Sequence, residues 1–391
     1  MSAGDVFERG AVDLIERREL SERLAKGRPL RVKFGMDPSS PDLHVGHAVP
    51  LFKLRALQDA GHVIVLIVGD STAMVGDPSG RNKLRPQLSR EEVERNLGTY
   101  VAQVSRVLDM SKTEVHRNSE WFDAMRFEDV LRLASRMTVA RMLERDTFET
   151  RMAAKEPIGI HEFLYPLMQG WDSVQIKCDV ELGGTDQLFN LLVGRALQEQ
   201  AGQPGQICLT LPLINGLDGR KMSKSYGNSI GITESAESMF GKVMSITDEA
   251  MGTWFRLLTN VPQAEIDALL AGSLRDAKAR LGVEIASFFH GRDTARGALD
   301  AFNRQFRDKQ VPDDVPEVTY PGPWPAAGVP LANLLRDLEL CASSSEARRL
   351  ISQGGVKLDG VVANDPMQLI NKPATPLLIQ AGKRKYARLI G

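Results

Sequence analysis

The sequence predicts an α/β protein in which a doubly wound, Rossmann-like parallel sheet is followed by a helical domain and a small α+β domain. Three observations support this fold class. Strand-like and helical patterns alternate from about residue 30 to 228, the pattern from 229 to 310 is helical, and a proline-rich stretch precedes a compact end piece. We therefore expect domains at 1–228, 229–310 and 331–391.

The first domain opens with a strand–helix–strand unit. The apolar runs LRVKFGM at 30–36 and VIVLIV at 63–68 are typical of buried strands, and a helical pattern covers about 45–60 between them. Two strands joined by a crossover helix pair in parallel, so this unit predicts a parallel sheet with helices on its faces.

The segment at 311–330 holds six of the chain's twenty prolines, which predicts a stiff, extended linker. The end piece, 331–391, has the pattern of a helix, a turn, a second helix and a hairpin around Asp359-Gly360. Ser344 or Ser345 is the expected cap of the second helix.

Composition limits the class of protein. With 42% hydrophobic residues, 25% charged residues and a formal net charge of −1, the chain is typical of a soluble globular protein, and nucleic-acid contact would need a local basic patch. The three cysteines are far apart, which argues against a disulfide framework and a cysteine zinc site and favours a reducing cytoplasm. The N-terminus lacks the apolar core of a signal peptide, and the run at 63–68 is too short to span a bilayer.

Two of the six histidines, His44 and His47, lie three residues apart in PDLHVGH, at the predicted helix start, with Asp42 as the expected N-cap. Residues at i and i+3 share a helix face, and free N–H groups at a helix start favour an anion such as phosphate. Gly46 allows a flat base to approach the backbone. We therefore expect a nucleotide here; the alternative is that both histidines are ordinary helix-start residues.

A second candidate nucleotide site is the loop LDGRKMSKSYGN at 217–228, which follows an apolar strand pattern. Lys221 and Lys224 could bring two ammonium groups to the charge that develops on a leaving pyrophosphate, although a solvated basic loop is the alternative. No G-x-x-x-x-G-K-[ST] pattern occurs, so a P-loop is not the nucleotide site.

Tyr165, Gln169 and Asp172 are spaced as one stripe of a helix among apolar neighbours. Because a buried carboxylate needs a partner, the stripe favours a pocket for a polar ligand over a core face; a solvent-facing stripe is the alternative. In the stretch GGTDQ at 183–187, two glycines precede a predicted helix, and Asp186 could bond ribose hydroxyls or cap that helix.

HVGH together with KMSKS resembles the signature of class I aminoacyl-tRNA synthetases. Within that class, GDPSG at 76–80, YPLMQGWD at 165–172 and ELGGTDQ at 181–187 resemble tyrosyl-tRNA synthetases. The resemblance covers nearly the whole chain, and the end piece is similar to a small RNA-binding domain shared with a ribosomal small-subunit protein.

The resemblance implies that L-tyrosine and ATP form tyrosyl-adenylate and pyrophosphate, and that tyrosine then passes to the 3′ end of tRNA(Tyr). It implies ATP with Mg²⁺, no tightly bound cofactor, no metal held by protein side chains, a cytoplasmic homodimer and no membrane partner. It also implies an inserted connective segment at about 115–165, which would contribute to the subunit interface and to the surface for the tRNA acceptor stem.

The resemblance also assigns site residues. The implied catalytic residues are His44, His47, Lys221, Lys224, Arg81 and Arg85. The implied ATP-binding residues are Ser39, His44, Gly46, His47, Gly183, Gly184, Asp186 and Lys224. The implied tyrosine-binding residues are Lys33, Asp37, Asp77, Tyr165, Gln169, Asp172 and Gln187.

Within the tyrosine set, the resemblance implies finer roles. Tyr165, Gln169 and Asp77 would hold the α-ammonium group, and Asp172 would accept a hydrogen bond from the phenol hydroxyl. Gln187 would lie near the tyrosine carboxylate and the α-phosphate of ATP.

The chain departs from the commonest bacterial pattern at three places. Lys33 replaces a tyrosine close to the phenol hydroxyl, Ser39 replaces a threonine, and the loop has a KMSKS sequence where many relatives have a KFGKT-like one. These differences indicate a distinct subgroup of bacterial enzymes, in which the hydroxyl contact depends more on Asp172.

The end piece carries nine Lys and Arg against five Asp and Glu, although the whole chain has a net charge of −1. A local basic face on a neutral protein favours contact with an RNA backbone, while a solvated charged face is the alternative. The candidate RNA-binding residues are Arg348, Arg349, Lys383, Arg384 and Lys385.

Three rival functions remain. A tryptophanyl-tRNA synthetase shares the fold and signatures, but Asp172 and the terminal domain favour tyrosine. A small-molecule nucleotidyltransferase can share the HxGH helix, but it does not account for the helical and basic terminal domains. A catalytically silent RNA-binding protein is disfavoured because HVGH, KMSKS, Asp77 and Asp172 are all intact.

Overall fold

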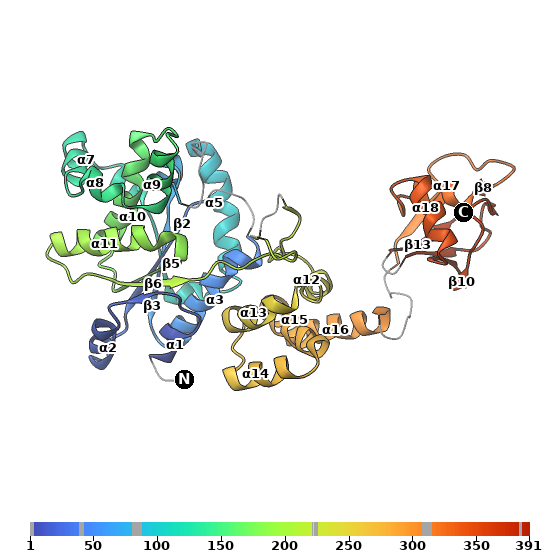
Figure 1. Ribbon diagram of the computed structural model, residues 1–391, viewed down its shortest axis with the longest axis horizontal. Coiled ribbons are helices and arrows are strands. Elements are labelled where there is room, and N and C mark those ends of the chain that lie inside the picture. The colour runs from blue at the N-terminus through green and yellow to red at the C-terminus, as the bar shows by residue number, and fades with distance from the viewer. Residues whose placement is uncertain are drawn as a thin grey trace. The chain divides into compact units, whose positions relative to one another are not determined.

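The computed structural model describes residues 4–38, 43–79, 88–220, 222, 226–306, 315–382 and 385–391. The chain divides into two compact units, Met1–Ala295 and Arg296–Gly391 (Figure 1). Each unit is described by itself.

The first unit contains a six-stranded sheet. In spatial order its strands are β1 (Leu14–Ile15), β6 (Ile207–Leu211), β5 (Val180–Gly184), β2 (Arg31–Met36), β3 (Val63–Val68) and β4 (Thr113–Arg117). The five strands β2 to β6 are parallel, and β1 is an antiparallel edge strand. The order of the chain through the sheet reverses between β2 and β5, and in such folds the carboxyl ends at that point form the ligand crevice.

Helices cover both faces of this sheet, which confirms the doubly wound prediction. Along β3, Ile64 and Leu66 pack in the cluster that includes α3 (Val45–Asp59) and α5 (Arg90–Val104). The alternate residues Val65 and Ile67 pack against Ile176, which follows α10 (Leu164–Gln175). In Figure 1, α10 and α11 (Leu188–Gln200) lie next to each other on the side of the sheet away from α3.

The connective segment between β4 and α10 is helical. Its elements are α6 (Ser119–Phe122), α7 (Phe127–Ala134), α8 (Val139–Met142), α9 (Asp146–Ala153) and the 3₁₀ turn η2 (Ile160–Phe163). The predicted insertion began at about residue 115, but residues 115–117 belong to β4 and pair with β3, so the helical insertion begins after the sheet strand.

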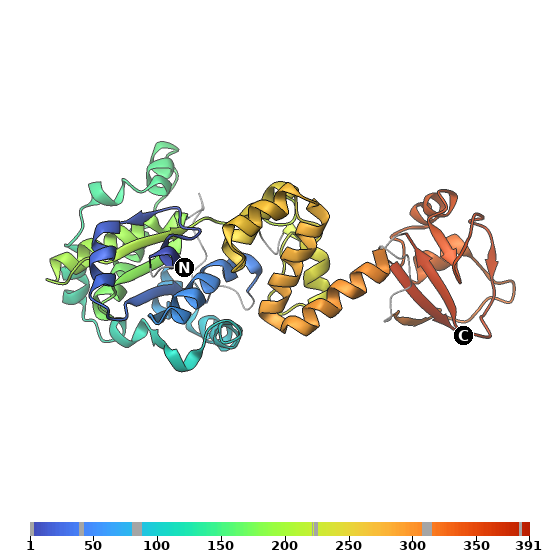
Figure 2. The ribbon, with the colours of Figure 1, turned by 90° about the horizontal axis from the view of Figure 1, so that it is seen from below.

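The region after the 217–228 loop is helical, as predicted. It contains α12 (Ala236–Val243), α13 (Met251–Leu258), α14 (Gln263–Ala271), α15 (Leu274–His290) and α16 (Arg292–Phe306). Helices α12 to α15 lie side by side (yellow in Figure 2).

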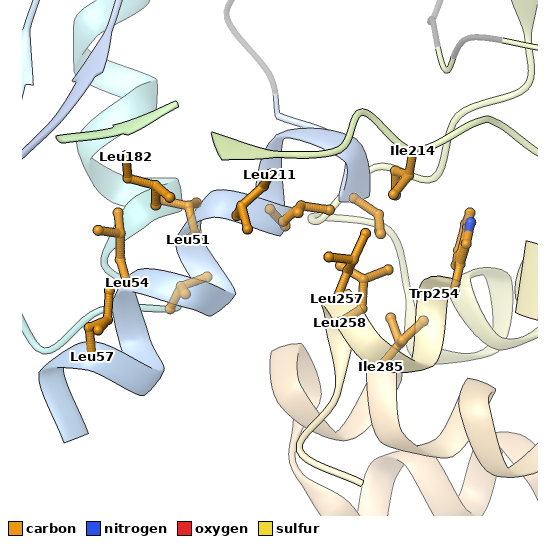
Figure 3. Close-up of a cluster of buried hydrophobic side chains, with 14 of the residues drawn as sticks. Leu51, Leu54, Leu57, Leu182, Leu211, Ile214, Trp254, Leu257, Leu258 and Ile285 are labelled. Atoms are coloured by element: carbon orange, nitrogen blue, oxygen red, sulfur yellow. The ribbon is translucent and has the colours of Figure 1, made fainter. Parts of the chain in front are cut away.

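The helices up to Ala295 share one core with the sheet domain, so they form a single compact unit with it. Figure 3 shows Leu51 and Leu54 of α3 in the same cluster as Leu257 of α13 and Ile285 of α15. The rings of Phe52 and Phe288 stack with centroids 3.8 Å apart. The sequence predicted separate domains because chain order gives no information about a shared core.

The N-terminal helices α1 (Asp5–Glu8) and α2 (Arg17–Ala25) also pack in this unit. Lys53 of α3 is buried, and its Nζ donates to the carbonyl oxygens of Val6, Phe7 and Arg9 at 2.5, 2.9 and 2.6 Å. These are orphan carbonyls at and just beyond the end of α1, so the ammonium group satisfies them.

The second unit is a small α+β domain. After α16 it contains β7 (Glu317–Thr319), β8 (Val329–Pro330), α17 (Leu331–Asp337), α18 (Ser344–Ser352), β9 (Val356–Leu358), β10 (Val361–Val362), β11 (Leu369–Ile370), β12 (Leu377–Ala381) and β13 (Lys385–Ile390). The predicted hairpin lies between β9 and β10, where Asp359 and Gly360 have φ angles of 48° and 83°. Two positive φ angles are typical of the turn that joins such short strands.

Two predictions for this unit differ from the structure. The proline-rich stretch is not all linker, because β7 pairs with β13 and β8 pairs with β11 inside the folded unit. β7 is an edge strand, where neighbouring prolines are tolerated because no second ladder is needed. The cap of α18 is Ser343, whose side chain accepts from the Glu346 N–H, and not Ser344 or Ser345.

Candidate active site

A cavity of about 370 Å³ lies at the carboxyl ends of β2 and β5, where the order of the strands reverses. It is lined by residues from stretches that are far apart in the chain, between Phe34 and Met222. The predicted residues that line it are Asp37, His44, Gly46, His47, Asp77, Tyr165, Gln169, Asp172, Gly183, Gly184, Asp186 and Gln187. The cavity therefore brings the HVGH, GDPSG, YPLMQGWD and GGTDQ stretches together.

The HVGH motif forms the first turn of α3. His44, and not the expected Asp42, is the N-cap; Asp42 lies outside the described residues. The rings of His44 and His47 stack with centroids 3.8 Å apart, and the His44 N–H donates to Nδ1 of His47 at 3.3 Å. A side chain at Gly46 would place its Cβ 2.9 Å from the His44 ring, so this position requires glycine.

The loop that carries KMSKS contacts this same turn. Met222 is buried, lines the cavity, and its sulfur accepts from the Gly46 N–H at 3.3 Å. Beyond the loop, Ile230 accepts from the Val45 N–H at 2.8 Å. Lys221 and Lys224 lie outside the described residues, as do Ser39, Arg81 and Arg85.

Asp172 is a buried carboxyl on the cavity wall, 3% exposed. It accepts from Trp121 Nε1 at 2.9 Å and from Asn118 Nδ2 at 3.4 Å. Burial raises the pKa of Asp172 to about 7, and the positive charge of Lys33 opposes the rise. The site therefore holds a carboxyl that is near its titration point at neutral pH.

Tyr165 and Asp37 form a second polar pair. The Tyr165 hydroxyl donates to Asp37 Oδ2 at 2.8 Å, and Thr72 donates to Asp37 Oδ1 at 2.8 Å. Since its proton is committed to Asp37, the Tyr165 oxygen is oriented to accept a hydrogen bond from a ligand. A Cβ at Gly69 would lie 2.1 Å from Asp37 Oδ1, so the close approach requires that glycine.

A continuous run of side-chain amides lies along the cavity. Asn190 Nδ2 donates to Oε1 of Gln169 at 2.8 Å and to Oε1 of Gln187 at 2.9 Å. Gln169 Nε2 donates to Glu181 at 3.0 Å, and Gln187 Nε2 donates to Asp77 at 2.9 Å. We call Gln169, Asn190 and Gln187 the amide chain.

Asp77 is held by three groups. Besides Gln187, the Ser79 N–H donates to it at 2.8 Å, and the Arg145 guanidinium lies 3.5 Å away. Arg145 is buried and lies over the rings of Phe148 and Phe189, and burial lowers its pKa. Arg145 of the connective segment thus balances the negative charge of Asp77.

Lys33 differs from its expected place. It is fully buried and is not among the residues that line the cavity. Its Nζ donates to Glu181 at 2.9 Å, to the backbone carbonyl oxygen of Gln169 at 2.7 Å and to Ser173 Oγ at 2.8 Å. Three donors with three partners leave no hydrogen for the hydroxyl of a ligand, so Lys33 acts behind the pocket and not in it.

The GGTDQ stretch ends β5 and forms the 3₁₀ turn η3 (Thr185–Gln187) before α11. A Cβ at Gly184 would lie 2.6 Å from Asp186 Oδ1, and one at Gly183 would lie 3.0 Å from Gln187 Cβ. The two glycines therefore permit the tight turn that presents both side chains. Asp186 is not a helix N-cap, because Gly184 and Gln187 hold those positions.

The candidate RNA-binding residues lie in the second unit. Arg348 and Arg349 are exposed on α18. Lys385 donates to the Leu340 carbonyl at 2.8 Å, so its ammonium group already has an intramolecular partner. Lys383 and Arg384 lie outside the described residues.

Sequence reasoning missed five polar residues around the cavity: Asn118, Trp121, Arg145, Glu181 and Asn190. Glu181 was detectable, since a carboxylate inside the strand run VELGG needs a buried partner. Asn118, Trp121 and Arg145 come from distant segments and give no local signal. Asn190 lies in α11, three residues after Gln187, where an asparagine by itself gives no signal.

Comparison with known proteins shows the family of the chain. The family described as "tRNA synthetases class I (W and Y)" matches residues 25–307, and the S4 domain matches residues 329–372. The chain is 50% identical over 394 residues to a tyrosine–tRNA ligase of Bordetella avium, covering 98% of this chain and 95% of that protein.

A second relative, a tyrosine–tRNA ligase of Ralstonia nicotianae, is 49% identical over 396 residues, covering 99% of each chain. The fold is similar to that of a C-terminally truncated mitochondrial tyrosyl-tRNA synthetase of Aspergillus nidulans, with a TM-score of 0.66, 24% identity, and coverage of 78% of this chain and 94% of that one. The chain therefore belongs to the bacterial tyrosyl-tRNA synthetases of class I.

Proposed function

We propose that the chain is a tyrosine–tRNA ligase that activates L-tyrosine with ATP and transfers it to tRNA(Tyr). The observation that carries the proposal is the pocket stripe of α10, where Asp172 and Tyr165 line one cavity two helical turns apart. Tyrosine has a hydroxyl at one end and an ammonium group at the other, with an aromatic ring between them. A pocket with separated acceptors on one helix face suits that molecule.

At one end, Asp172 is the acceptor for the phenol hydroxyl. Its donors Trp121 and Asn118 fix the orientation of the carboxyl. A phenylalanine side chain would bury this carboxyl without the hydroxyl donor that tyrosine brings to its remaining lone pairs, which is costly. The site thereby selects tyrosine.

At the other end, the α-ammonium group is held by acceptors. The Tyr165 oxygen has its proton directed to Asp37, Gln169 offers its carbonyl oxygen, and Asp77 supplies a charge. The expected place of Gln187 near the tyrosine carboxylate is part of the proposal, although its NH₂ group donates to Asp77 and to Ser79 in this structure.

ATP occupies the HVGH side of the cavity. We assign its phosphates to the first turn of α3, with His44, His47 and Ser39 on one side and the Arg81, Arg85, Lys221 and Lys224 loops on the other. Gly46, Gly183 and Gly184 allow the nucleotide to approach the backbone, and Asp186 holds ribose hydroxyls.

Activation needs no general base, because the tyrosine carboxylate is already an anion. It attacks the α-phosphorus in line and pyrophosphate leaves, so the protein's contribution is positioning and stabilisation of charge. In the part of the chain that the structure describes, no three His, Cys, Asp or Glu side chains gather as metal ligands. We assign Mg²⁺ to the phosphates and water, as is common for nucleotide enzymes.

A homodimer is part of the proposal. On the connective segment, Phe127 and Leu131 are one helical turn apart on α7 and are 77% and 55% exposed, and Ile160 is 84% exposed. Exposed apolar side chains gathered on one segment are typical of an interface. We place the partner subunit there.

The second unit is proposed to contact tRNA through Arg348 and Arg349, with the acceptor-stem surface also on the connective segment. Cys178, Cys208 and Cys341 are free and buried, which suits the reducing cytoplasm that we propose as its location. Across the described ranges, every helix is too short or too polar to serve as a membrane span.

Amino-acid-dependent ATP–pyrophosphate exchange tests the proposal, with tyrosine, tryptophan and phenylalanine compared. Exchange with tyrosine alone is the expected result. Exchange with tryptophan would retain the class but overturn the role of Asp172. No exchange from folded protein that binds tRNA would favour the RNA-binding alternative.

A further inference from the structure

The amide chain of Gln169, Asn190 and Gln187 joins two carboxylates, one of them buried and the other on the cavity wall. Glu181 lies at one end and Asp77 at the other, and each carboxylate has its own cation, Lys33 and Arg145 respectively. An ionised carboxylate only accepts hydrogen bonds. Each terminal glutamine must therefore turn its NH₂ group outward and its carbonyl oxygen toward Asn190.

Asn190 confirms this direction. It gives both hydrogens of its NH₂ group to the two glutamine oxygens. Among the residues that the structure describes, its own buried oxygen Oδ1 has no hydrogen-bond partner. If the Asn190 amide were reversed, its oxygen would face the side-chain oxygens of Gln169 and Gln187. The NH₂ group of Asn190 must therefore point toward the two glutamines, even though this leaves its own oxygen unsatisfied.

The surroundings of Glu181 hold the first end of the chain. Oε1 accepts from Lys33 and Gln169, while Oε2 accepts from Ser173 at 3.2 Å and from Gln206. Gln206 also donates to the Leu191 carbonyl at 2.9 Å, so its NH₂ group cannot turn away. Lys33 and Glu181 are 0% and 1% exposed, which keeps water from competing for these bonds.

We propose that the buried Lys33–Glu181 pair is the positioning element that sets the orientation of the Gln169 amide at its end of the amide chain, so that carbonyl oxygen and not NH₂ is presented to the α-ammonium group of the amino acid. The inference rests on the proposed function, since it takes tyrosine as the ligand. An amide oxygen has two lone pairs, and Asn190 uses one on Gln169, which leaves the second for the ligand. A reversed Gln169 would present hydrogens to an ammonium group and repel it.

The pair carries no net charge, so its effect can be separated from simple attraction. In the neutral double variant K33M/E181Q, the new amide meets fixed donors from Gln206 at the Oε2 position. Its oxygen is therefore placed there and its NH₂ group faces Gln169, which must turn its own oxygen toward it. Only the Gln169 end reverses, because Asp77 still accepts from Gln187 and keeps the oxygen of that glutamine toward Asn190. The net charge of the site is unchanged.

The test compares the affinities of L-tyrosine and 3-(4-hydroxyphenyl)propionate, which lacks the ammonium group, by titration calorimetry on the full chain. In K33M/E181Q the ratio of the two affinities should fall about tenfold, because a hydrogen bond from a charged donor is lost. The affinity for the propionate should change less than about twofold. A folded variant with the ratio of the native protein overturns the inference.

A matched control removes another buried ion pair. Arg151 and Glu162 pair at 2.6 Å and are also buried, but they lie outside the amide chain and the cavity lining. R151M/E162Q should keep the native ratio; a fall equal to that of K33M/E181Q would mean that the loss of any buried pair loosens the pocket.

The charge-swapped variant K33E/E181K gives a second test if the neutral variant does not fold. It keeps one cation and one anion but places a donor against Gln169. A fall in the ratio of the affinity for L-tyrosine to that for the propionate supports the inference, and a ratio equal to that of the native protein refutes it. Pyrophosphate exchange by the native chain separates the two proposals. Exchange with tyrosine together with unchanged ratios would refute only the role of the pair, whereas no exchange would refute the proposed function.

Discussion

Asp172→Asn should stabilise the fold at alkaline pH while it weakens amino-acid selection. Asp172 is buried, and burial raises its pKa from 3.8 to about 7 against the opposing charge of Lys33. The folded chain therefore holds this proton to a higher pH than the unfolded chain does. The group favours folding below pH 4, and that contribution is lost as the pH rises through 7.

The size of the effect follows from the pH interval. Between pH 5.5 and 7 the unfolded carboxyl is ionised and the folded one is protonated, so the native protein loses about 2 kcal/mol of unfolding free energy. The asparagine variant has no group that titrates there, and its oxygen can still accept from Trp121. Relative to the native protein, it should gain about 2 kcal/mol between pH 5.5 and 8.

Urea unfolding followed by circular dichroism at pH 5.5 and pH 8 measures this gain. A stability difference that is the same at both pH values would refute the assignment of a buried, titrating carboxyl. Pyrophosphate exchange at pH 8 gives the second measurement. Preference for tyrosine over phenylalanine should fall about 10- to 100-fold, the value of a hydrogen bond to a charged acceptor, and an unchanged preference would mean that another group binds the hydroxyl.

Three further outcomes are expected. Leu131→Asp should dissociate the proposed dimer in analytical ultracentrifugation, because a charge would be buried in the interface; a dimer of native affinity would place the interface elsewhere. Arg348→Ala combined with Arg349→Ala should weaken tRNA binding and reduce the slope of log affinity against log salt by about two, since each phosphate contact contributes about 0.9; an unchanged slope would remove both residues from the RNA surface. Lys53→Met should lower the free energy of unfolding in urea by about 2 kcal/mol, because three carbonyls lose their donor; no change would mean that water replaces the ammonium group there.

The parallel sheet could be predicted because its signals are local. The runs at 30–36 and 63–68 both form strands, of which β3 is buried and β2 is partly buried, and the helix between them begins within one residue of the expected position. The stripe of Tyr165, Gln169 and Asp172 is also local, since one helix fixes the spacing, and all three line the cavity.

The partners of those residues could not be predicted, because they come from other segments. Trp121 reaches Asp172 from the connective segment, and Glu181 reaches Lys33 from a different strand. Lys33 illustrates the limit most clearly. Its position in the chain suggested the pocket, but a lysine beside a buried glutamate forms an internal pair, and only the tertiary structure places the glutamate there.

The two signature motifs can be identified from the sequence, but the contacts between them cannot. HVGH and KMSKS are recognisable separately, yet their relation depends on backbone bonds between segments that are far apart in the chain. The Val45 N–H donates to Ile230, the Ile232 N–H donates to Leu43 at 3.3 Å, and Met222 accepts from Gly46. The helix start that would receive phosphate is therefore held by Met222 of the loop and by Ile230 and Ile232, which follow the loop. Because Gly46 has one N–H, an anion that accepts a hydrogen bond from it must displace the Met222 sulfur. A substitution in either motif therefore alters this contact between the two motifs.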